Sequence, residues 1–508
     1  MKAKKVESIL IVGGGTAGWL TAGIIAAKHG TSVSITVVES PNIKTVGVGE
    51  GTWPTMKTTL QEMGVSETDF LRQCDASFKQ GAKFCQWKTG EQSDYYYHPL
   101  MLPRDFDEFN SAPFWLSQNS GESFSNSVCF QQALCEKNLA PKTLTMPEYA
   151  GAANYAYHLE AGKFAQFLTH HCTTKLNVNH IKATVENVKL TDSGEIDYLL
   201  TKEVGQLEAD LYIDCSGFCS LLLGQALDVP FVDKSDVLFL DTAIATHVPY
   251  PTENSAIVPH TLSTAQTSGW IWDIGLQSRR GVGHVYSSKY IDDQTAKQQL
   301  ADYLCTDVQS LETKTIPMPC GHREKFWQKN CVAIGLAAGF LEPLEASALV
   351  LVEMSAQFIR DQLPAHTSIM PIVAKRFNTT FHYRWQRIID FLKLHYVLSQ
   401  RRDSEFWCAQ QDACSIPESL QELLSLWQYQ SPWRHDFLHK DEVFPAASYQ
   451  YVLYGMGFKT HCREDEANKA HYQQLLEETS FTKHRAIKAL PPTRELLNTL
   501  HQHRMQVI

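Results

Sequence analysis

The chain has 508 residues, of which 44% are hydrophobic and 20% charged, as in ordinary soluble globular proteins, and this length allows about three domain-sized units. The formal net charge is −10 at pH 7, so we expect no basic surface that would attract nucleic acid or an anionic membrane. The 13 cysteines form no C-x-x-C pair or zinc-ribbon spacing, which indicates neither a disulfide framework nor a metal site and favours a reducing, cytoplasmic location.

The first 40 residues predict a strand, a helix and a second strand. Residues 6–12 are a β-rich apolar run, residues 19–28 continue as a helix of small residues, and residues 32–39 return as a strand. The uncharged stretch 9–27 superficially resembles a membrane span, but the glycines at its centre favour a strand, a turn and a helix. We therefore expect one βαβ unit and no membrane partner.

The middle of the chain is predicted to be mixed α/β. Residues 95–147 are aromatic and irregular, as in an insertion that packs over another part of the protein. Residues 151–172 are predicted to form a helix, 206–217 a strand that enters a glycine turn, and 237–290 a series of strands.

A long amphipathic helix is predicted after residue 355. Its apolar side chains recur at helical spacing: Phe377, Phe381, Trp385, Ile388, Ile389, Leu392 and Tyr396. We interpret this stripe as core rather than as a cofactor-binding face, and the C-terminal third is expected to be mostly helical.

The turn after the first strand carries a Gly13-x-Gly15-x-x-Gly18 motif. In such a turn Gly13 permits the tight bend, Gly15 lets the backbone approach a pyrophosphate, and Gly18 allows close helix packing. Glu39 follows Gly18 by 21 residues, where a carboxylate would reach a ribose hydroxyl. The motif alone is weak evidence, but strand, turn, helix, strand and acid occur in order, which predicts a bound dinucleotide.

Two later segments favour FAD over NAD as that dinucleotide. Residues 210–217 place Asp214 at the end of a strand before a small-residue turn, as in the second flavin motif of FAD monooxygenases. Residues 330–340 form a strand that leads into small residues around Leu336, where backbone could approach an isoalloxazine ring. Each segment alone would also fit an ordinary βα unit.

Taken together, several segments resemble the flavin-dependent tryptophan halogenase family. They are residues 12–19 (VGGGTAGW), 47–50 (GVGE), 77–81 (SFKQG), 269–274 (GWIWDI), 340–345 (FLEPLE), 390–396 (DFLKLHY) and 455–457 (GMG). The resemblance implies an α/β fold with a Rossmann-like FAD-binding module of monooxygenase type, a mixed-sheet substrate region and a helical C-terminal region.

The predicted division of the chain follows from this resemblance. The FAD-binding module is expected to comprise residues 1–95, 148–225 and 310–360. The substrate region comprises 96–147 and 226–309, and residues 361–508 form a mostly helical region that covers the substrate.

The family's chemistry implies roles for two side chains. Reduced FAD (FADH2) reacts with O2 to a flavin hydroperoxide, which chloride or bromide attacks to give hypohalous acid. Lys79 matches the catalytic lysine that captures or hydrogen-bonds the electrophilic halogen, either as a neutral amine or as a positioned donor. Glu345 matches a glutamate near that lysine, where a carboxylate can polarise the halogenating species or deprotonate the cationic arene.

Further residues match the family's cofactor and halide positions. Thr16, Ala17, Gly49 and Glu50 extend the expected FAD site. Backbone amides of Ser347 and Ala348, at a helix N-terminus, align with the halide-binding positions. This sequence departs from the family there, since Ala346 replaces a residue with a hydroxyl group and Ala348 replaces a glycine.

Trp270 and Trp272 match a tryptophan pair that keeps substrate away from the flavin, with Gly275 where proline is usual. Alternation along a strand would place both indoles on one face, so a role in core packing is also open.

The substrate pocket departs most from the family. His98 and Leu100 are expected to contact substrate, but Leu100 is aliphatic where an aromatic side chain is usual. Residues 448–451 only approximate the lid that holds the amino and carboxylate groups of free tryptophan. We therefore expect an indole-like or other electron-rich arene, with free tryptophan still open.

No second nucleotide fingerprint is evident, which implies a separate NAD(P)H-dependent flavin reductase as partner; a homodimer is left open. Two other functions remain as alternatives at this point. They are an FAD-dependent aromatic hydroxylase and a flavin-binding protein without turnover.

Overall fold

The computed structural model describes residues 4–43, 49–118, 121–439, 441–463 and 466–507. The chain forms two compact units. Unit 1 comprises Met1–Asp75, Leu159–Ser235 and Pro319–Trp385, and unit 2 comprises Ala76–His158, Asp236–Met318 and Gln386–Ile508. Gly47, part of one family-like segment, lies outside the described residues.

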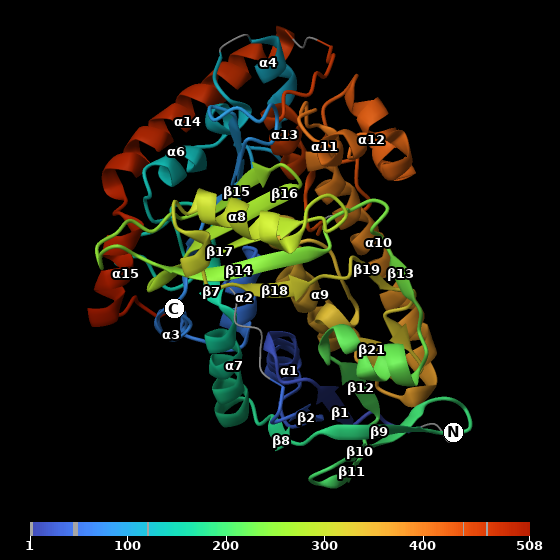
Figure 1. The fold of residues 1–508 in the computed structure, drawn as a ribbon. Coiled ribbons are helices and arrows are strands. Elements are labelled where there is room, and N and C mark those ends of the chain that lie inside the picture. The colour runs from blue at the N-terminus through green and yellow to red at the C-terminus, as the bar shows by residue number, and fades with distance from the viewer. Residues whose placement is uncertain (1–3, 44–48, 119–120, 440, 464–465, 508) are drawn as a thin grey trace. The chain divides into compact units, whose positions relative to one another are not determined.

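Unit 1 is built on a six-stranded sheet of order β20-β21-β12-β1-β2-β8 (Figure 1). Its strands are β1 (Ser8–Val12), β2 (Ser34–Glu39), β8 (Asn179–Lys182), β12 (Leu211–Asp214), β20 (Trp327–Gln328) and β21 (Cys331–Ala333). All neighbours pair in parallel except β20 with β21. Val12 lies opposite both Val38 and Asp214, so the carboxyl ends of β2, β1 and β12 meet at one edge, where open α/β sheets bind ligands.

Helices α1 (Thr16–His29), α7 (Ala161–Lys175) and α9 (Ser347–Gln362) pack together in unit 1. Small residues allow this close approach, since a Cβ on Gly23 would lie 2.2 Å from Met63 Cε. The remaining elements of unit 1 are β3 (Gly49–Gly51), α2 (Thr55–Glu62), α3 (Glu67–Gln73), β9 (Val185–Leu190), β10 (Ile196–Thr201), β11 (Gly205–Leu207), η1 (Gly217–Cys219), the π-helical turn η2 (Leu221–Ala226), β13 (Phe231–Asp233), β19 (Gly321–Arg323), η4 (Gly335–Ala337), β22 (Gly339–Phe340), η5 (Leu344–Ala346) and η6 (Thr367–Ile369). The predicted βαβ opening is confirmed.

One predicted helix is half wrong. Residues 151–172 contain strand β7 (Ala156–Glu160) before α7 begins at Ala161. Residues 155–159 are all buried, and residues 156–158 pair with β4 (Ser77–Lys79). An apolar pattern alone does not distinguish such a fully buried strand from a helix.

Unit 2 contains a seven-stranded sheet of order β18-β14-β17-β16-β15-β5-β6. The strands are β5 (Gly81–Cys85), β6 (Tyr95–Pro99), β14 (Thr242–Pro249), β15 (Thr261–Gln266), β16 (Gly269–Gly275), β17 (Arg279–Tyr286) and β18 (Lys314–Pro317). Helix α8 (Asp293–Tyr303) covers one face, where Ala296 and Leu300 pack with Ile271 and Val282 (Figure 1). The strands predicted within 237–290 are confirmed.

The irregular insertion and the C-terminal helices pack together in unit 2. The insertion contains helices α4 (Ala112–Ser117), α5 (Phe124–Val128) and α6 (Gln131–Glu136). The C-terminal part contains helices α11 (Glu405–Ala409), α12 (Glu418–Trp427), α13 (Ala446–Gly455), α14 (Lys469–Ala489) and α15 (Thr493–Gln502). Unit 2 also has the short turns η3 (Val308–Ser310), η7 (Ala413–Ser415) and η8 (Glu466–Asn468). Phe114 stacks on Tyr472, with ring centroids 5.3 Å apart.

The predicted long helix is α10 (Met370–Val397). Every residue of its apolar stripe is buried, which confirms the stripe as core. All 13 cysteines are free thiols. Within the described ranges, no helix is both long enough and apolar enough to cross a bilayer.

The two compact units do not follow the boundaries predicted for the functional modules. Residues 76–95, assigned by sequence to the FAD-binding module, belong to unit 2, because β4 pairs with β7 and β5 pairs with β15.

Candidate functional site

The glycine turn of unit 1 has the geometry of a pyrophosphate cradle. Gly13 has φ +124°, and a Cβ there would lie 2.1 Å from Cys215 O. A Cβ on Gly18 would lie 1.9 Å from Gly13 O, whereas a Cβ on Gly15 would meet nothing within 4 Å. Gly13 and Gly18 are therefore required by the fold itself, and the space above Gly15 fits an approaching phosphate.

The first turn of α1 provides donors for such an anion. Gly15 is the N-cap residue, with no side-chain cap, so the amides of Thr16 and Ala17 begin a helix whose N-terminus carries partial positive charge. The Thr16 hydroxyl lies 3.4 Å from Ala161 O, so this side chain also ties α1 to α7.

Exchanging Gly15 and Gly18 for alanine should separate ligand binding from folding. Gly15→Ala should keep the unfolding temperature within about 2 °C and weaken FAD binding about 10-fold or more, because only the ligand meets the new methyl group. Gly18→Ala should lower the unfolding temperature, because its Cβ meets backbone. Fluorescence titration with FAD and thermal unfolding measure both; unchanged FAD affinity in Gly15→Ala would contradict the cradle.

Glu39 lies beside this turn, as its spacing predicted. A Cβ on Gly14 would lie 1.5 Å from Glu39 Oε2, so the carboxylate rests against the glycine backbone. Its other oxygen is 3.0 Å from His180 Nε2, on the neighbouring strand β8. The carboxylate thus has a fixed position at the sheet edge, within the same region as the cradle.

Asp214 holds the adjoining turn. Its buried carboxylate accepts hydrogen bonds from the amides of Leu222 and Leu223, both at 2.8 Å, and from Ser216 N at 3.1 Å. The Ser216 and Ser220 hydroxyls also donate to it. These bonds give Asp214 a structural task beside the cradle, and direct contact with a cofactor stays a prediction.

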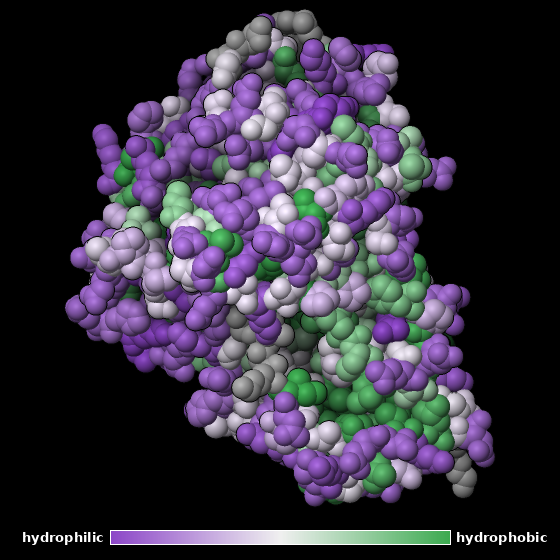
Figure 2. All heavy atoms as spheres, in the orientation of Figure 1, coloured by the Kyte–Doolittle hydropathy of each residue, from purple (hydrophilic) through white to green (hydrophobic). Residues whose placement is uncertain are grey.

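Leu336 lies in η4, close to the start of α1. A Cβ on Gly335 would lie 2.9 Å from Ala17 Cβ, which shows how near the two segments come. Leu336 is 38% exposed, as are Phe218 and Phe231 to a similar extent. Figure 2 shows hydrophobic side chains gathered on this part of unit 1, near β12 and β21. An exposed apolar surface beside a phosphate cradle suits the flat ring of a flavin.

The carboxyl group of Glu50, in β3, has a pKa near neutral pH. Burial raises its pKa to about 7, and the negative charge of Glu160 adds to the rise. Glu160 itself caps α7 by accepting a bond of 2.5 Å from Lys163 N. Gly49 precedes Glu50 in the same strand. Their contact with FAD stays a prediction.

Glu345 and the halide positions form one structural element in unit 1. Glu345 (φ 61°) and Ala346 (φ 53°) are both left-handed, and α9 begins directly after them at Ser347. Glu345 is buried, and its backbone oxygen accepts a 2.9 Å hydrogen bond from Trp53 Nε1. Ser347 and exposed Ala348 supply the first amides of a 16-residue helix, so the acid and the candidate anion donors are held together.

The left-handed Ala346 predicts a stability effect. A non-glycine residue pays about 1–2 kcal/mol in this conformation, and glycine's larger unfolded-state entropy offsets part of that cost. Ala346→Gly should therefore stabilise the protein by about 0.5–1 kcal/mol, measured by urea unfolding. Ala348→Gly, inside the first helical turn, is the matched control and should destabilise by up to about 1 kcal/mol. A lower free energy of unfolding in Ala346→Gly than in the wild type would contradict the inferred backbone strain at Ala346.

Lys79 is buried at the end of β4 in unit 2, with 2% of its surface exposed. The strand is anchored on both sides of it. The Ser77 hydroxyl donates to Gly275 O, and Gln80 N donates to Pro259 O at 2.7 Å. A buried amine on an anchored strand fits the role predicted for Lys79, and that role stays a prediction.

The predicted substrate residues adjoin the lysine segment. Leu100 N donates to Gln80 O at 3.2 Å, and His98 pairs with Ala82 in the β5–β6 ladder. Both His98 and Leu100 are buried. The structure thus brings Lys79, His98 and Leu100 into one region of unit 2.

The expected lid is a buried helix. Residues 448–451 belong to α13, where Ser448 Oγ lies 2.9 Å from His98 Nε2 and Tyr451 OH donates to Met101 O at 2.9 Å. Gln450 Nε2 donates to Pro432 O at 2.6 Å. The two hydroxyls and the Gln450 amide nitrogen are thus engaged within the protein, whereas Gln450 Oε1 is buried with no hydrogen-bond partner among the described residues.

Trp270 and Trp272 share one face of β16, as predicted. Trp270 is buried, 6.3 Å from the ring centroid of Trp87. The Trp272 ring covers Gly283 on β17, where a Cβ would lie 2.2 Å from it. Both indoles therefore contribute to packing; their role in guarding the flavin stays a prediction.

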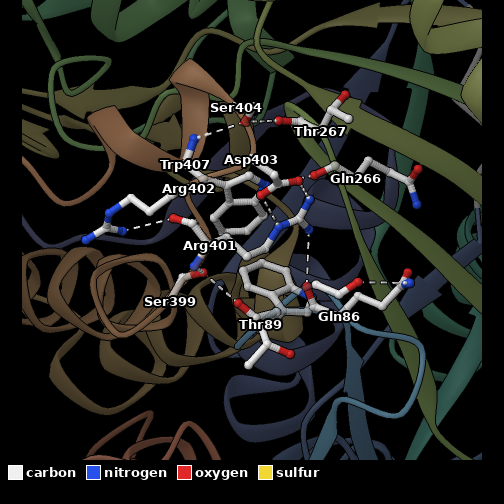
Figure 3. A network of polar contacts seen from close by, with 12 residues as sticks. Gln86, Thr89, Gln266, Thr267, Ser399, Arg401, Arg402, Asp403, Ser404 and Trp407 are labelled. Carbon is white, nitrogen blue, oxygen red and sulfur yellow. Dashed lines mark hydrogen bonds and ion pairs between the residues drawn. The ribbon is translucent and has the colours of Figure 1, made fainter.

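A network of polar contacts surrounds Arg401 and Trp407 in unit 2 (Figure 3). Arg401 donates to Asp403 through Nε (2.9 Å) and Nη2 (2.6 Å), donates to Gln86 O at 3.1 Å, and lies over the Trp407 ring. Trp407 Nε1 in turn donates to the backbone oxygen of Gln266, the last residue of β15, at 2.8 Å, and Gln266 pairs with Gly269 at the start of β16. The network therefore ties the start of the Trp270 strand to the segment after α10.

Sequence reasoning missed two buried titratable groups. Glu353 in α9 accepts hydrogen bonds from Thr59 (2.6 Å) and Thr55 (3.1 Å), and burial raises its pKa to about 8. His158 in β7 lies near Lys79, and burial followed by the charge of Lys79 lowers its pKa. A glutamate on the apolar face of a predicted helix was the available signal for Glu353. His158 gave none, because its neighbours come from distant strands.

Comparisons with known proteins agree on one family. The family model described as Tryptophan halogenase matches residues 8–471. Tryptophan 6-halogenase SttH of Streptomyces toxytricini is 33% identical over 478 residues, with 90% of each chain covered. A crystal structure of a tryptophan halogenase from Shewanella frigidimarina has a TM-score of 0.97 at 46% identity, covering 99% of each chain. Xcc4156, a flavin-dependent halogenase from Xanthomonas campestris, has a TM-score of 0.89 at 31% identity, covering 99% of this chain and 100% of its own.

Proposed function

The chain belongs to the tryptophan halogenase family and is, as its sequence predicted, a flavin-dependent halogenase; from this premise we propose that it halogenates an electron-rich arene through Lys79 and Glu345. The observation that carries the proposal is the burial of Lys79 on an anchored strand next to His98 and Leu100. That arrangement supports the proposal, because the buried lysine and the candidate substrate residues come from segments whose backbones are bonded to each other.

FAD fits the cradle of unit 1, where Gly13, Gly15 and Gly18 with the amides of Thr16 and Ala17 would hold the pyrophosphate and Glu39 a ribose. When bound in its reduced form, FAD supplies, with O2, the oxidant that turns chloride or bromide into hypohalous acid.

The protein's own groups then direct the halogen. The Lys79 Nζ hydrogen-bonds or captures the electrophilic halogen and presents it to an arene carbon. The Glu345 carboxylate accepts the proton that this carbon loses when aromaticity returns. Amides of Ser347 and Ala348 bind the halide at the N-terminus of α9, beside Glu345.

We propose an indole-like substrate. Leu100 offers an aliphatic wall, and the hydroxyls of Ser448 and Tyr451 and the amide nitrogen of Gln450 are bonded within the protein. An arene without amino and carboxylate groups demands no partners from these side chains. SttH is named for tryptophan, so free tryptophan is the comparison substrate.

We also propose that a separate NAD(P)H-dependent reductase supplies FADH2, that the enzyme works in the cytoplasm, where its 13 free thiols persist, and that it can form a homodimer.

The test combines the protein with FAD, a flavin reductase, NADH, bromide and either indole or tryptophan. A brominated product, formed faster from indole, is expected by mass spectrometry. Oxygenated product that does not depend on halide would instead identify a hydroxylase. Bound FAD with no halogenated product across a panel of arenes would identify a flavin-binding protein without turnover.

A further inference from the structure

The peptide unit between Glu345 and Ala346 joins two left-handed residues. Glu345 has φ 61° and Ala346 has φ 53°, a conformation that is unfavourable for residues with a Cβ. Ala346 is also the N-cap residue of α9 and makes no side-chain cap. Because neither residue type favours this bend, contacts with the surrounding structure have to stabilise it.

Both polar groups of this peptide unit are bonded. Its N–H, from Ala346, donates to Pro343 O at 3.1 Å within the same turn. Its C=O, from Glu345, accepts the 2.9 Å hydrogen bond from Trp53 Nε1, which is 292 residues away in the sequence. Because a peptide unit is planar, the two bonds together fix the orientation of the whole unit. The Trp53 bond ties this orientation to a segment outside the turn.

The segment that carries Trp53 is fastened to α9 at a second point. Trp53 is 8% exposed and lies two residues before α2 begins at Thr55. The hydroxyls of Thr59 and Thr55 donate to the buried carboxyl group of Glu353 in α9, at 2.6 and 3.1 Å. Glu353 lies about two helical turns beyond the bend. Helix α2 therefore holds the indole of Trp53 in a fixed place relative to α9.

A loosened peptide unit would displace the carboxylate of the proposed site. With α9 held in place, a rotation about φ of Ala346 turns the peptide unit and moves the Cα of Glu345, and the side chain moves with it. The amides of Ser347 and Ala348 stay with the helix. The carboxylate of Glu345 would therefore shift relative to these two amides.

We propose that Trp53 is a positioning residue for halogen transfer: its indole N–H holds the peptide unit between Glu345 and Ala346 and thereby fixes the Glu345 carboxylate relative to the first amides of α9. This inference rests on the proposed role of Glu345 as the base that accepts the arene proton. Trp53 exchanges no proton in this role and acts through the backbone of the bend.

Site-specific replacement of Trp53 by 3-benzothienylalanine removes the bond alone, because sulfur stands where the indole N–H was and the ring keeps its size. Trp53→Phe also removes the N–H but leaves a smaller ring, and it is the genetically encoded second variant. Trp327 is the matched control: it is a buried tryptophan of the same unit, and its Nε1 donates to Lys329 O at 3.1 Å. Each replacement by 3-benzothienylalanine should lower the unfolding temperature to a similar extent, since each loses one buried hydrogen bond.

The assay is steady-state bromination of indole by the flavin-loaded enzyme. With 3-benzothienylalanine at position 53, kcat should fall about 10- to 100-fold, because a displaced carboxylate accepts the arene proton more slowly. KM for bromide and KM for indole should each change less than about 3-fold, because the amides of α9 stay in place. The same replacement at Trp327 should leave kcat within about 2-fold of the wild type, because the two bonds share no partner. Wild-type kcat after replacement of Trp53, or equal losses at both positions, would overturn the proposal.

Glu345→Gln keeps the two proposals distinguishable. In this background, replacement of Trp53 should cause no additional loss of kcat, because residues that act as a unit are not additive. If Glu345→Gln alone halogenates at the wild-type rate, the proposed role of Glu345 fails, and the positioning role fails with it. If Glu345→Gln is impaired while the Trp53 variants are not, only the positioning role fails.

Hydrogen exchange of the flavin-free protein gives a readout that needs no turnover. The Ala346 amide should exchange about 10-fold faster after replacement of Trp53, because the peptide unit then opens more often. Replacement of Trp327 should leave the exchange rate at Ala346 unchanged. In the wild type, NMR should find the indole proton of Trp53 protected, since it is bonded and buried, and this measurement needs no variant. An unprotected indole proton, or an unchanged rate at Ala346 after replacement of Trp53, would overturn the proposal.

Discussion

Lys79→Met should lower kcat for bromination of indole by about 100- to 10,000-fold, the range expected for loss of a positioned group that acts in the transition state. Methionine keeps the length and apolar stem of lysine, and β4 remains held by Ser77 and Gln80. Thermal unfolding and FAD affinity should therefore change little. Product mass spectrometry measures the loss of bromination, and FAD titration measures whether cofactor affinity is retained.

Lys83→Met provides the control for Lys79. Lys83 is on the adjacent strand β5, with Nζ 4.3 Å from the Tyr95 ring centroid, so its removal also deletes a lysine near the sheet. This variant should retain most of its activity. Equal losses in both variants would mean that a general change in the strands, and not the Lys79 amine, limits the reaction.

Glu353→Gln should remove a large part of the pH dependence of stability. The pKa of Glu353 is about 8 in the folded protein and 4.5 in a model peptide, because burial penalises the carboxylate. A raised pKa means that the folded state favours the proton, so the stabilisation is complete below pH 4.5 and is lost as the pH rises through 8. The wild type should lose up to about 5 kcal/mol across this window, from a shift of about 3.5 pH units.

Urea unfolding at pH 5, 7 and 8.5 tests this expectation. Glu353→Gln should lose less stability than the wild type between the first and last pH, because glutamine has no proton to lose. Asp361→Asn is the control at the far end of α9. Hydrogen bonds from Arg360 lower the pKa of Asp361, a shift opposite in direction to that of Glu353. The Asp361→Asn variant should therefore lose as much stability above pH 5 as the wild type does. Parallel declines in the wild type and Glu353→Gln would show that the carboxyl group is not neutral in the folded state.

Much of the fold could be predicted from local sequence patterns. The strand, glycine turn and helix over residues 8–29 are each encoded by contiguous residues, and so is the stripe of α10. The prediction for the first half of 151–172 was wrong because β7 is the central strand of a sheet of order β3-β7-β4, whose other strands lie about 80 residues or more away in the sequence. Helix and buried strand have similar apolar runs, and long-range pairing decides between them.

The candidate site could be predicted where a local sequence motif fixes the backbone. It could not be predicted where the positions of side chains depend on the pairing register of distant strands. Gly13, Gly15, Gly18 and Glu39 come together because one βαβ unit positions them. The approach of Leu100 to Gln80 and of His158 to Lys79 depends on strand pairing between separate segments. The bonds that occupy Asp214 come from the turn that follows it, whose π-helical form no sequence pattern announced.

The left-handed pair Glu345–Ala346 has a consequence for how this enzyme can evolve. The same two residues fix the backbone of the Glu345 carboxylate and precede the first turn of α9, whose amides we propose as halide donors. A substitution that relaxes this bend gains thermal resistance and loosens two reactive features at once. Selection for robustness and selection for turnover therefore compete at a single bend in the backbone, a stability–activity trade-off confined to two residues.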